Sequence, residues 1–423
     1  MNGGKRPLWL IIAVLAGLTV MALVIFRARP APVVSPIAGQ PASTAPSSAA
    51  SGTNAGAPAQ SAHGLTSTSG PDDWAMEGYN PARTRSIEAG VALPFTQQRA
   101  LAVSGDTGDG SPLTIAHGVI LIESPHRLRA LDLSSGAERW SLPLDGVYIS
   151  PAVAGNTVFV RSEADNKGQM LALDIASGKQ RWAFRPRRLS SASNGYFGGH
   201  LTSPVVVGGT VFLGAGKEVY ALDAATGAQR WQFAAQDYIS SSATVADGRI
   251  YIADFAHLYS IDQQTGVLAW AFPTTNSIYF SPVVAGQTVL LTNGDQLVAL
   301  DTASGKPRWN LSIPGEELIP GAAQGSRVFA KSTSTLYALE LASGSVLWQA
   351  HNLNFISLPV VAGDQVFVVS GMGADTAVSA LDATTGRGTW KQSVASLATA
   401  APVIAGQSLY VRTTDGRVLG FWH

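Results

Sequence analysis

The stretch that decides the fold is "LVALDTASGKPRW", which runs from Leu297 to Trp309. Its first residues alternate with a period of two, as the residues of a half-buried strand do. The acid, Ser and Gly that follow are typical of a tight turn, because a side-chain oxygen can accept backbone N–H groups and Gly can adopt a positive φ. The stretch therefore predicts a strand, a turn and a second strand that begins at about the Trp.

Six further copies of this element make the chain a repeat protein. In every copy a Gly stands four residues after the acid and a Trp eight residues after it. The acids are Asp132, Asp174, Asp223, Asp262, Asp301, Glu340 and Asp382, and the tryptophans are Trp140, Trp182, Trp231, Trp270, Trp309, Trp348 and Trp390. Successive acids are 39 to 49 residues apart, which is the period of a propeller blade.

The constant residues of the repeat have structural roles that suffice to explain them. We expect the acids to cap turns, with Glu340 as a tolerated variant, and the Trp rings to fill the gaps between neighbouring sheets while each indole N–H finds a partner. The alternatives are a ring of catalytic carboxylates and a ligand-stacking platform, and neither is needed to explain any copy.

A β-hairpin pattern precedes each copy, for example "SPVVAGQTVLLT" before Asp301. An eighth hairpin begins at Ala401 and is followed by "RVLGFWH", so the last unit lacks its Trp strand. A lone strand, "QQRALAVSG" from Gln97 to Gly105, precedes the first hairpin. Paired with Val418 to Phe421 it completes an eighth four-stranded sheet, and closure removes the exposed edges of an open array. We therefore predict an all-β, eight-bladed β-propeller, expected to be monomeric.

The N-terminus predicts a single membrane anchor over residues 1–27. The 19 residues from Leu8 to Phe26 carry no charge and are long enough to span a bilayer as a helix. A cleaved signal peptide is the alternative, although its apolar region would be shorter and followed by a small-residue site. The flanking basic residues, two on each side, leave orientation undecided by charge.

A linker separates this anchor from the propeller at residues 72–423. Residues 28–71 are rich in Ala, Pro, Ser, Gly and Thr, and such a composition cannot bury enough apolar surface to fold. A flexible tether after a single span is common in domains held outside the cytoplasm. We therefore expect the propeller on the periplasmic or extracytoplasmic side of the cytoplasmic membrane.

Composition excludes several classes of function. The chain has no cysteine, so disulfides, thiol catalysis and lipid attachment through Cys are excluded. Its formal net charge is zero and no basic stripe occurs, which argues against a nucleic-acid partner. The seven histidines show no zinc-site spacing, and neither a GxSxG motif nor a phosphate-binding loop is present.

The "ALDxxTGxxxW" units resemble the repeats of the PQQ-type, quinoprotein-like β-propeller family. The stretch "DDWAMEGYNPARTRS" from Asp72 to Ser86, here named the lead-in, resembles the segment before the first blade in that family. The family holds both dehydrogenases and non-enzymatic scaffolds, and the chain is most similar to its BamB-like, non-enzymatic branch. The absence of a lipid-bearing Cys departs from that branch and favours the cytoplasmic membrane over the outer one.

The resemblance leaves two functions open. One is an envelope scaffold that binds another protein or a peptide and has no catalytic, cofactor or metal residues. The other is an oxidoreductase or sensor that holds a quinone or other small ligand at the ring axis. The family's dehydrogenases use a vicinal disulfide, a calcium ion held by carboxylate and amide groups, and a catalytic Asp, and without cysteine this chain cannot form the disulfide.

The longest interruption of the repeat is the best candidate for a partner site. The insertion "RPRRLSSASNGYFGGH", Arg185 to His200, combines arginines with aromatic residues, the types that dominate interface energetics. Its candidate residues are Arg185, Arg187, Arg188, Tyr196 and Phe197. A solvated loop of chance composition is the alternative. Smaller insertions near Asp165 and Met372 are polar or glycine-rich and rank lower.

Overall fold

The computed structural model describes residues 33–36, 73–101, 113–124, 126–144, 149–162, 168–186, 202–276, 278–354 and 356–423. The chain divides into two compact units, Met1–Ala31 and Pro32–His423, and every described residue belongs to the second. The predicted anchor lies outside the described residues. Within the described part, no helix has the length and apolar character needed to cross a membrane.

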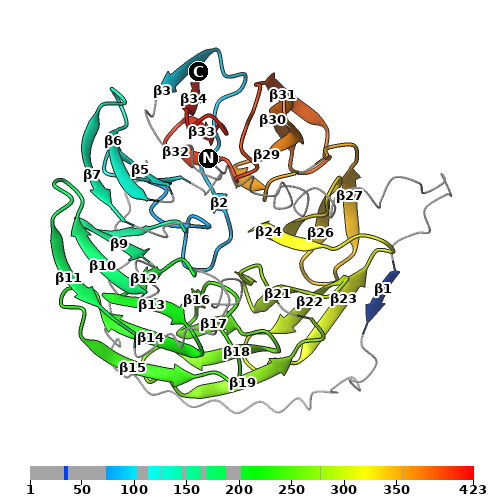
Figure 1. Cartoon of the computed structure of the whole chain (residues 1–423). Helices are drawn as coiled ribbons and strands as arrows, with labels where there is room; N and C mark the ends of the chain where they lie inside the picture. The colour runs from blue at the N-terminus through cyan, green and yellow to red at the C-terminus, as the bar shows by residue number, and fades with distance from the viewer. Residues whose placement is uncertain are drawn as a thin grey trace, which may run out of the picture. The chain divides into compact units, whose positions relative to one another are not determined.

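Eight sheets form the blades of a propeller around a central axis (Figure 1). Each blade is an antiparallel four-stranded meander, and from blade 1 to blade 7 the first strand of each blade contacts that of the next at the inner edge. Seven blades are built from strands consecutive in sequence, as the repeat predicts. The predicted all-β, eight-bladed architecture is confirmed for the described residues.

Blades 1 to 4 follow the first four repeats. Their strands are β4 (Thr114–Ala116), β5 (Val119–Ser124), β6 (Arg127–Asp132), β7 (Glu138–Pro143), β8 (Ala152–Ala154), β9 (Thr157–Ser162), β10 (Gln169–Asp174), β11 (Gln180–Phe184), β12 (Val205–Val207), β13 (Thr210–Ala215), β14 (Glu218–Asp223), β15 (Gln229–Ala234), β16 (Thr244–Ala246), β17 (Arg249–Ala253), β18 (His257–Asp262) and β19 (Leu268–Pro273).

Blades 5 to 8 complete the propeller. Their strands are β20 (Val283–Ala285), β21 (Thr288–Asn293), β22 (Gln296–Asp301), β23 (Pro307–Ser312), β24 (Ile319–Gln324), β25 (Arg327–Lys331), β26 (Leu336–Glu340), β27 (Val346–Ala350), β28 (Val360–Ala362), β29 (Gln365–Met372), β30 (Asp375–Asp382), β31 (Gly388–Ser393), β32 (Val403–Ala405), β33 (Ser408–Arg412), β34 (Val418–Trp422) and β3 (Gln97–Leu101). Two short strands extend blades 5 and 7, namely β1 (Val33–Pro36) and β2 (Ser86–Ile87).

Burial explains why the inner and outer strands of a blade have different hydrophobic patterns in the sequence. Every residue of the second strands β9, β13 and β21 is buried, because both faces of these strands pack against neighbouring blades. The outer strands β15 and β19 alternate between exposed and half-buried residues. Continuous apolar runs are expected for the first kind of strand and alternation for the second.

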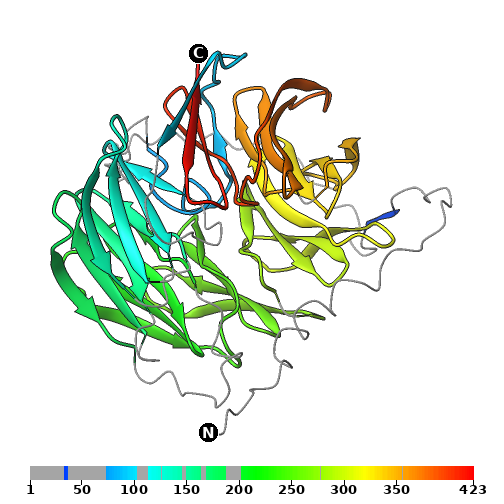
Figure 2. The same cartoon turned by 45° about the horizontal axis from the view of Figure 1, so that its top comes forward.

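Both ends of the propeller sequence meet in blade 8, as predicted. Strand β3 pairs antiparallel with β34, from Gln97 opposite Trp422 to Leu101 opposite Val418. Figure 2 shows the blue strand β3 lying beside the red strand β34. Of the lone strand predicted over Gln97 to Gly105, the described part ends at Leu101, and residues 102–105 lie outside the described residues. The split blade closes the ring.

The six repeated aspartates cap turns by accepting backbone N–H groups. In blade 3, Asp223 Oδ1 accepts hydrogen bonds from the backbone N and the Oγ1 of Thr226, at 2.9 and 2.8 Å. Asp223 Oδ2 accepts one from Arg230 at 2.7 Å. Gly227 has a φ of 74°, which supplies the left-handed residue of the turn. An Arg seven residues after the acid makes the same ion pair in blades 1, 2 and 5.

The repeated Trp residues lie between neighbouring blades, where the sequence predicts that they pack. The indole N–H of Trp309 donates to the carbonyl oxygen of Leu341 in the next blade at 2.9 Å. The ring lies so close to Gly344 that an added Cβ would come within 2.5 Å of it. The same two contacts recur for Trp140, Trp182, Trp231, Trp270 and Trp348.

The junction between blades 8 and 1 uses different residues for the same purpose. Arg99 stands opposite Gly420, where the other blades place Trp, and its guanidinium donates to the carbonyl oxygens of Ser134 and Ser135 in blade 1. Leu101 packs against Gly136. At the preceding junction, Trp390 packs edge-on against Phe95 and Phe421.

One short piece of the predicted linker is described. Val33–Pro36 forms β1, which pairs antiparallel with the outer strand β23 of blade 5. Residues 37–71 lie outside the described residues, so the disorder predicted for the linker stays a prediction.

Candidate functional site

The insertion that the sequence singled out is described only at its first two residues. Arg185 is exposed and follows β11 directly. Arg187, Arg188, Tyr196 and Phe197 lie outside the described residues, so the structure does not bring the five candidate residues together. Their role as a partner site stays a prediction.

The strand ends that flank the three insertions lie on one face of the propeller. In a four-stranded meander, the turn between the second and third strands lies at the same end of the blade as the connection to the next blade. The insertion near Asp165 joins β9 to β10, the one near Met372 joins β29 to β30, and the longest joins β11 to β12. We call this end of the blades the connection face. The DxxTG turns lie at the opposite face.

The lead-in runs along the inner edge of the propeller instead of standing apart from it. Its backbone from Trp74 to Arg85 hydrogen-bonds to the first strands of six blades. The partners are Ile115, Val153, Val245, Val284, Ala323 and Val361. Trp74 is 1% exposed and packs in the core that also contains blades 7 and 8. The lead-in is therefore an inner belt that ties the blades together.

A buried charge cluster lies within this belt. Glu77 pairs with Arg83 at 3.1 Å and with Arg85 at 3.5 Å. The arginine side chains are 0% and 4% exposed, whereas that of Glu77 is 21% exposed. Arg83 also donates to the carbonyl oxygen of Ala243 at 2.8 Å, and Arg85 to that of Gly321 at 3.0 Å. Two cations share one carboxylate, so the cluster carries an excess positive charge.

The environment of the cluster shifts the pKa values of its members. Burial alone would raise the pKa of Glu77, but the charges of Arg83 and Arg85 and a hydrogen bond from Ser203 lower it below its ordinary value. Burial lowers the pKa of Arg85 to about 10, with Glu77 opposing the shift and Arg83 adding to it. Arg83 and Arg85 also have positive φ values of 56° and 43°, a strained conformation that the surrounding contacts hold in place.

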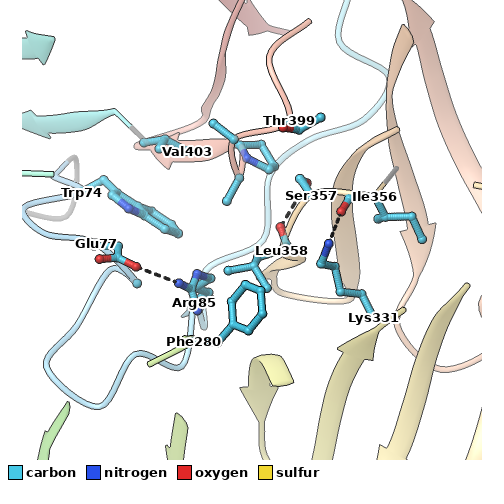
Figure 3. Close-up of a pocket in the computed structure, with 14 residues that line it drawn as sticks. Trp74, Glu77, Arg85, Phe280, Lys331, Ile356, Ser357, Leu358, Thr399 and Val403 are labelled. Atoms are coloured by element: carbon cyan, nitrogen blue, oxygen red, sulfur yellow. Dashed lines mark hydrogen bonds and ion pairs between the residues drawn. The ribbon is translucent and has the colours of Figure 1, made fainter. Parts of the chain in front are cut away.

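A cavity of about 350 Å³ lies beside this cluster (Figure 3). We call it the axial cavity. One wall is the lead-in, and the others are connections and strand ends of blades 5 to 8. Its lining residues are Trp74, Glu77, Gly78, Arg85, Phe280, Lys331, Ile356, Ser357, Leu358, Thr399, Ala400, Ala401, Pro402 and Val403. Most of the lining comes from connections between blades, so the cavity belongs to the connection face.

Lys331 is the second cation of the axial cavity. Its ammonium group donates to the carbonyl oxygen of Ile356 at 2.6 Å, as Figure 3 shows. In the described part of the chain, no carboxylate lies within ion-pair distance of this ammonium. Burial lowers the pKa of Lys331, and the charge of Glu317 partly offsets the effect. The site therefore holds an incompletely compensated cation.

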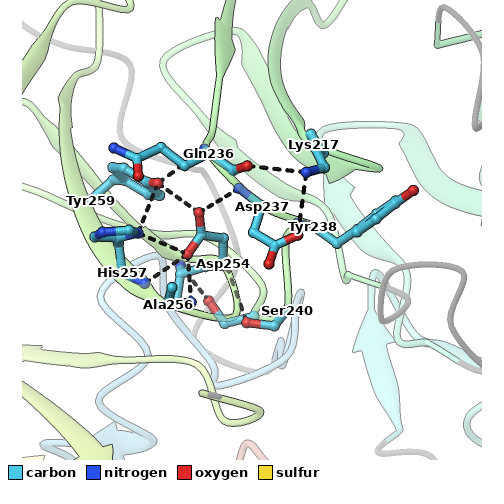
Figure 4. Close-up of polar contacts among 11 residues, drawn as sticks. Lys217, Gln236, Asp237, Tyr238, Ser240, Asp254, Ala256, His257 and Tyr259 are labelled. Atoms are coloured by element: carbon cyan, nitrogen blue, oxygen red, sulfur yellow. Dashed lines mark hydrogen bonds and ion pairs between the residues drawn. The ribbon is translucent and has the colours of Figure 1, made fainter. Parts of the chain in front are cut away.

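A second polar cluster, between blades 3 and 4, has a structural role (Figure 4). Asp254 is fully buried and accepts the hydroxyl of Tyr259 at 2.6 Å and the backbone N–H groups of Asp237 and His257 at 2.9 and 2.7 Å. Burial and the hydrogen bond to Asp254 raise the pKa of Tyr259. These contacts join the connection between blades 3 and 4 to the turn between β17 and β18. Both carboxylate oxygens of Asp254 already accept hydrogen bonds, which is typical of a structural role.

The sequence predicts some of these residues and not others. Trp74 and Arg83 belong to the lead-in motif, but the motif alone does not show that Arg83 and Arg85 share one carboxylate. Lys331 and Ser357 follow ordinary hairpin patterns and carry no signal. Only the closed ring places them beside the lead-in, more than 240 residues away in the chain.

Comparison with known proteins identifies the family. A family model described as outer membrane protein assembly factor BamB matches residues 61–217, 187–318 and 316–422. The chain belongs to this BamB family. The resemblance to PQQ-type propellers is thereby confirmed. No curated protein matches the chain.

Solved structures of other propellers show the same fold. Quinohemoprotein alcohol dehydrogenase from Comamonas testosteroni is 15% identical with a TM-score of 0.64, over 83% of this chain and 80% of that one. The computationally designed Ika8 protein is 13% identical with a TM-score of 0.62, over 76% and 98%. BamB from Moraxella catarrhalis is 21% identical with a TM-score of 0.45, over 80% and 92%. At these identities the similarity to the dehydrogenase and to Ika8 concerns the fold alone, and the TM-score of BamB supports no conclusion.

The axial cavity does not fit the calcium-assisted quinone site that the resemblance describes. Among the described residues that line it, Glu77 is the one carboxylate, and two arginines already engage it. Among the described residues, no group of three His, Asp or Glu side chains is arranged to hold a metal ion. The residues present are therefore not the donor set that such a site needs.

Proposed function

We propose that the protein is a membrane-anchored, extracytoplasmic propeller that binds another envelope protein or a peptide as a non-enzymatic scaffold. The observation that carries the proposal is membership of the BamB family over almost the whole propeller. The turn chemistry supports it, because the repeated aspartates of blades 1, 2, 3 and 5 engage a capped turn with one oxygen and an Arg with the other. These carboxylates serve the fold.

The connection face is the proposed partner-binding face. The opposite face carries near-identical turns fixed by the repeat, whereas all three insertions depart from strand ends of the connection face. Loops on a rigid scaffold commonly carry binding residues. Arg185, exposed directly after β11, is the described residue among the five candidates of the longest insertion.

The test replaces Arg185, Arg187, Arg188, Tyr196 and Phe197 together by Ala in the full chain. The proposal expects loss of co-purification of a cross-linked envelope partner, with an unchanged melting temperature. The matched control replaces the exposed residues Lys179, Lys306 and Arg387 on the opposite face and should retain capture. Capture that survives in the five-residue variant would reject this insertion as the binding site.

The proposed location has its own test. Anchoring in the cytoplasmic membrane expects the chain in the inner-membrane fraction, with the propeller digested by protease added to spheroplasts but not to intact cells. Recovery in the cytosol or in the outer membrane would contradict it.

The alternative is an oxidoreductase or sensor with a quinone at the ring axis. The observation in its favour is that a quinohemoprotein dehydrogenase has the same fold. Against it, the residues that line the axial cavity do not supply the metal ligands of a calcium-assisted quinone site. Quinone absorbance in the purified chain, with dye reduction driven by an alcohol, would favour the enzyme over the scaffold.

A further inference from the structure

We propose that the axial cavity binds a carboxylate attached to an apolar body, namely a small free carboxylic acid or the apolar C-terminal residue of a peptide. This inference goes beyond the scaffold function and does not depend on it, because it concerns the cavity and not the insertions. It rests on the charge, the walls and the size of the cavity.

The charge of the cavity favours an anion. Lys331 and Arg85 both line it, and the carboxylate of Glu77 is shared between Arg85 and Arg83. Lys331 makes a single hydrogen bond, to the carbonyl oxygen of Ile356, which leaves two ammonium hydrogens without a partner in the described residues. A buried cation without a counter-ion is costly, and a bound carboxylate would compensate it.

The walls of the cavity favour an apolar body on that carboxylate. Trp74, Phe280, Ile356, Leu358 and Val403 supply aromatic and aliphatic surface. The volume of about 350 Å³ lies near the lower end of small-molecule sites, which span about 300 to 1,000 Å³. A ligand with one charged group and one branched or aromatic side chain matches this lining. A multiply hydroxylated sugar would leave most of its polar groups without partners.

The experiment measures binding to the purified full-length chain by isothermal titration calorimetry. The probes are 4-methylpentanoate, the peptide acetyl-Ala-Ala-Leu with a free C-terminal carboxylate, and the same peptide with a C-terminal amide. The proposal expects millimolar or tighter binding of at least one acid and at least about tenfold weaker binding of the amide, because a hydrogen-bonded charge is lost. Tighter binding of 4-methylpentanoate would indicate a free acid as the ligand, and tighter binding of the peptide acid would indicate a peptide C-terminus.

Two variants locate the site. Lys331→Gln keeps a donor for the carbonyl oxygen of Ile356 but removes the charge, and it should weaken binding of the acid at least about tenfold. Lys306→Gln, at an exposed turn on the opposite face, is the matched control and should leave binding unchanged. Ala400→Trp fills the cavity without changing any charge and should abolish binding with the fold intact.

Three outcomes would overturn the proposal. They are equal binding of the acid and amide peptides, no binding of either acid at millimolar concentration, and unchanged binding in both Lys331→Gln and Ala400→Trp. Melting curves of each variant show whether it is folded, and if Lys331→Gln is not, Ala400→Trp decides. Partner capture in the scaffold test does not depend on these results, so failure of one proposal is distinguishable from failure of the other.

Discussion

Asp223 shows how one residue of the repeat stabilises a blade. Its carboxylate accepts hydrogen bonds from Thr226 and from Arg230, and its side chain is 29% exposed. The hydrogen bond from Arg230 has the largest effect in lowering the pKa of Asp223 to about 2, and the hydrogen bond from Thr226 has the next largest. Since both partners favour the charged form, the unfolded chain binds this proton more readily than the folded one.

The acid stability of the protein should therefore depend on Asp223. Because the folded pKa of about 2 lies below the ordinary value of 3.8, its contribution is full above about pH 4 and is lost as the pH falls toward 2. Asp223→Asn should lower the free energy of unfolding at pH 7 and make its dependence on pH shallower between pH 4 and 2. Urea denaturation across this range measures both effects.

Blade 6 offers the control for that prediction. Glu340 occupies the position of the acid, but Leu347 stands where the other blade places its Arg, and it is 46% exposed. Glu340→Gln should change the free energy of unfolding less than Asp223→Asn does. Equal effects of the two substitutions would show that the ion pair with Arg230 contributes nothing measurable.

At the scale of single residues, the sequence predicts local roles and misses distant ones. The roles of Asp223, Gly227 and Trp231 follow from turn chemistry and packing within one repeat and its neighbour, so the pattern suffices. Lys331 cannot be singled out, because its significance comes from Arg85 and Trp74, which only ring closure brings to the same cavity.

At the scale of elements, the lead-in is the part that the repeat does not explain. It has almost no regular strand, yet it supplies backbone hydrogen bonds to six blades and buries two arginines at the inner edge. The sequence motif marks it as a segment before the first blade. Its path cannot be predicted from the motif, since the partners are single backbone groups spread from Ile115 to Val361.

Removing the carboxylate of the lead-in should destabilise the whole propeller. Glu77→Gln leaves Arg83 and Arg85 buried without their counter-charge, and breaking a buried pair typically costs about 3 to 5 kcal/mol. We expect a loss of about 3 kcal/mol, toward the lower end of that range, because the Glu77 side chain is 21% exposed. Chemical denaturation measures the loss.

The neighbouring residue Glu88 provides the matched substitution. It is exposed and lies two residues beyond the lead-in, and Glu88→Gln should change the free energy of unfolding by no more than about 0.5 kcal/mol, as for an ordinary surface position. A Glu77→Gln variant as stable as Glu88→Gln would mean that the two buried arginines are compensated by other groups.

At the scale of the whole molecule, closure of the ring could be predicted from the sequence. The last repeat lacks its fourth strand, and one extra strand precedes the first repeat. The pairing of β3 with β34 satisfies both. The residues at the junction were not predictable. Arg99 and Leu101 replace the Trp contact there, and no repeat pattern specifies them.

The ring should not survive without its closing strand. Deleting Arg417 to His423 removes β34, which leaves β3 without a strand partner and β33 paired only with β32. It also takes Val418, Leu419 and Phe421 out of a core cluster that blade 8 shares with its neighbours. Burial of each such side chain contributes about 1.5 to 3 kcal/mol, so the loss is at least about 5 kcal/mol, comparable with the total stability of a typical domain. Thermal melting followed by circular dichroism should show a much lower midpoint or no cooperative transition.

Deleting Met1 to Pro71 is the control for this deletion. The core clusters of the described residues begin at Trp74, so this variant should be a soluble monomer that melts cooperatively. If the C-terminal deletion melted like this control, closure by β34 would not hold the ring together.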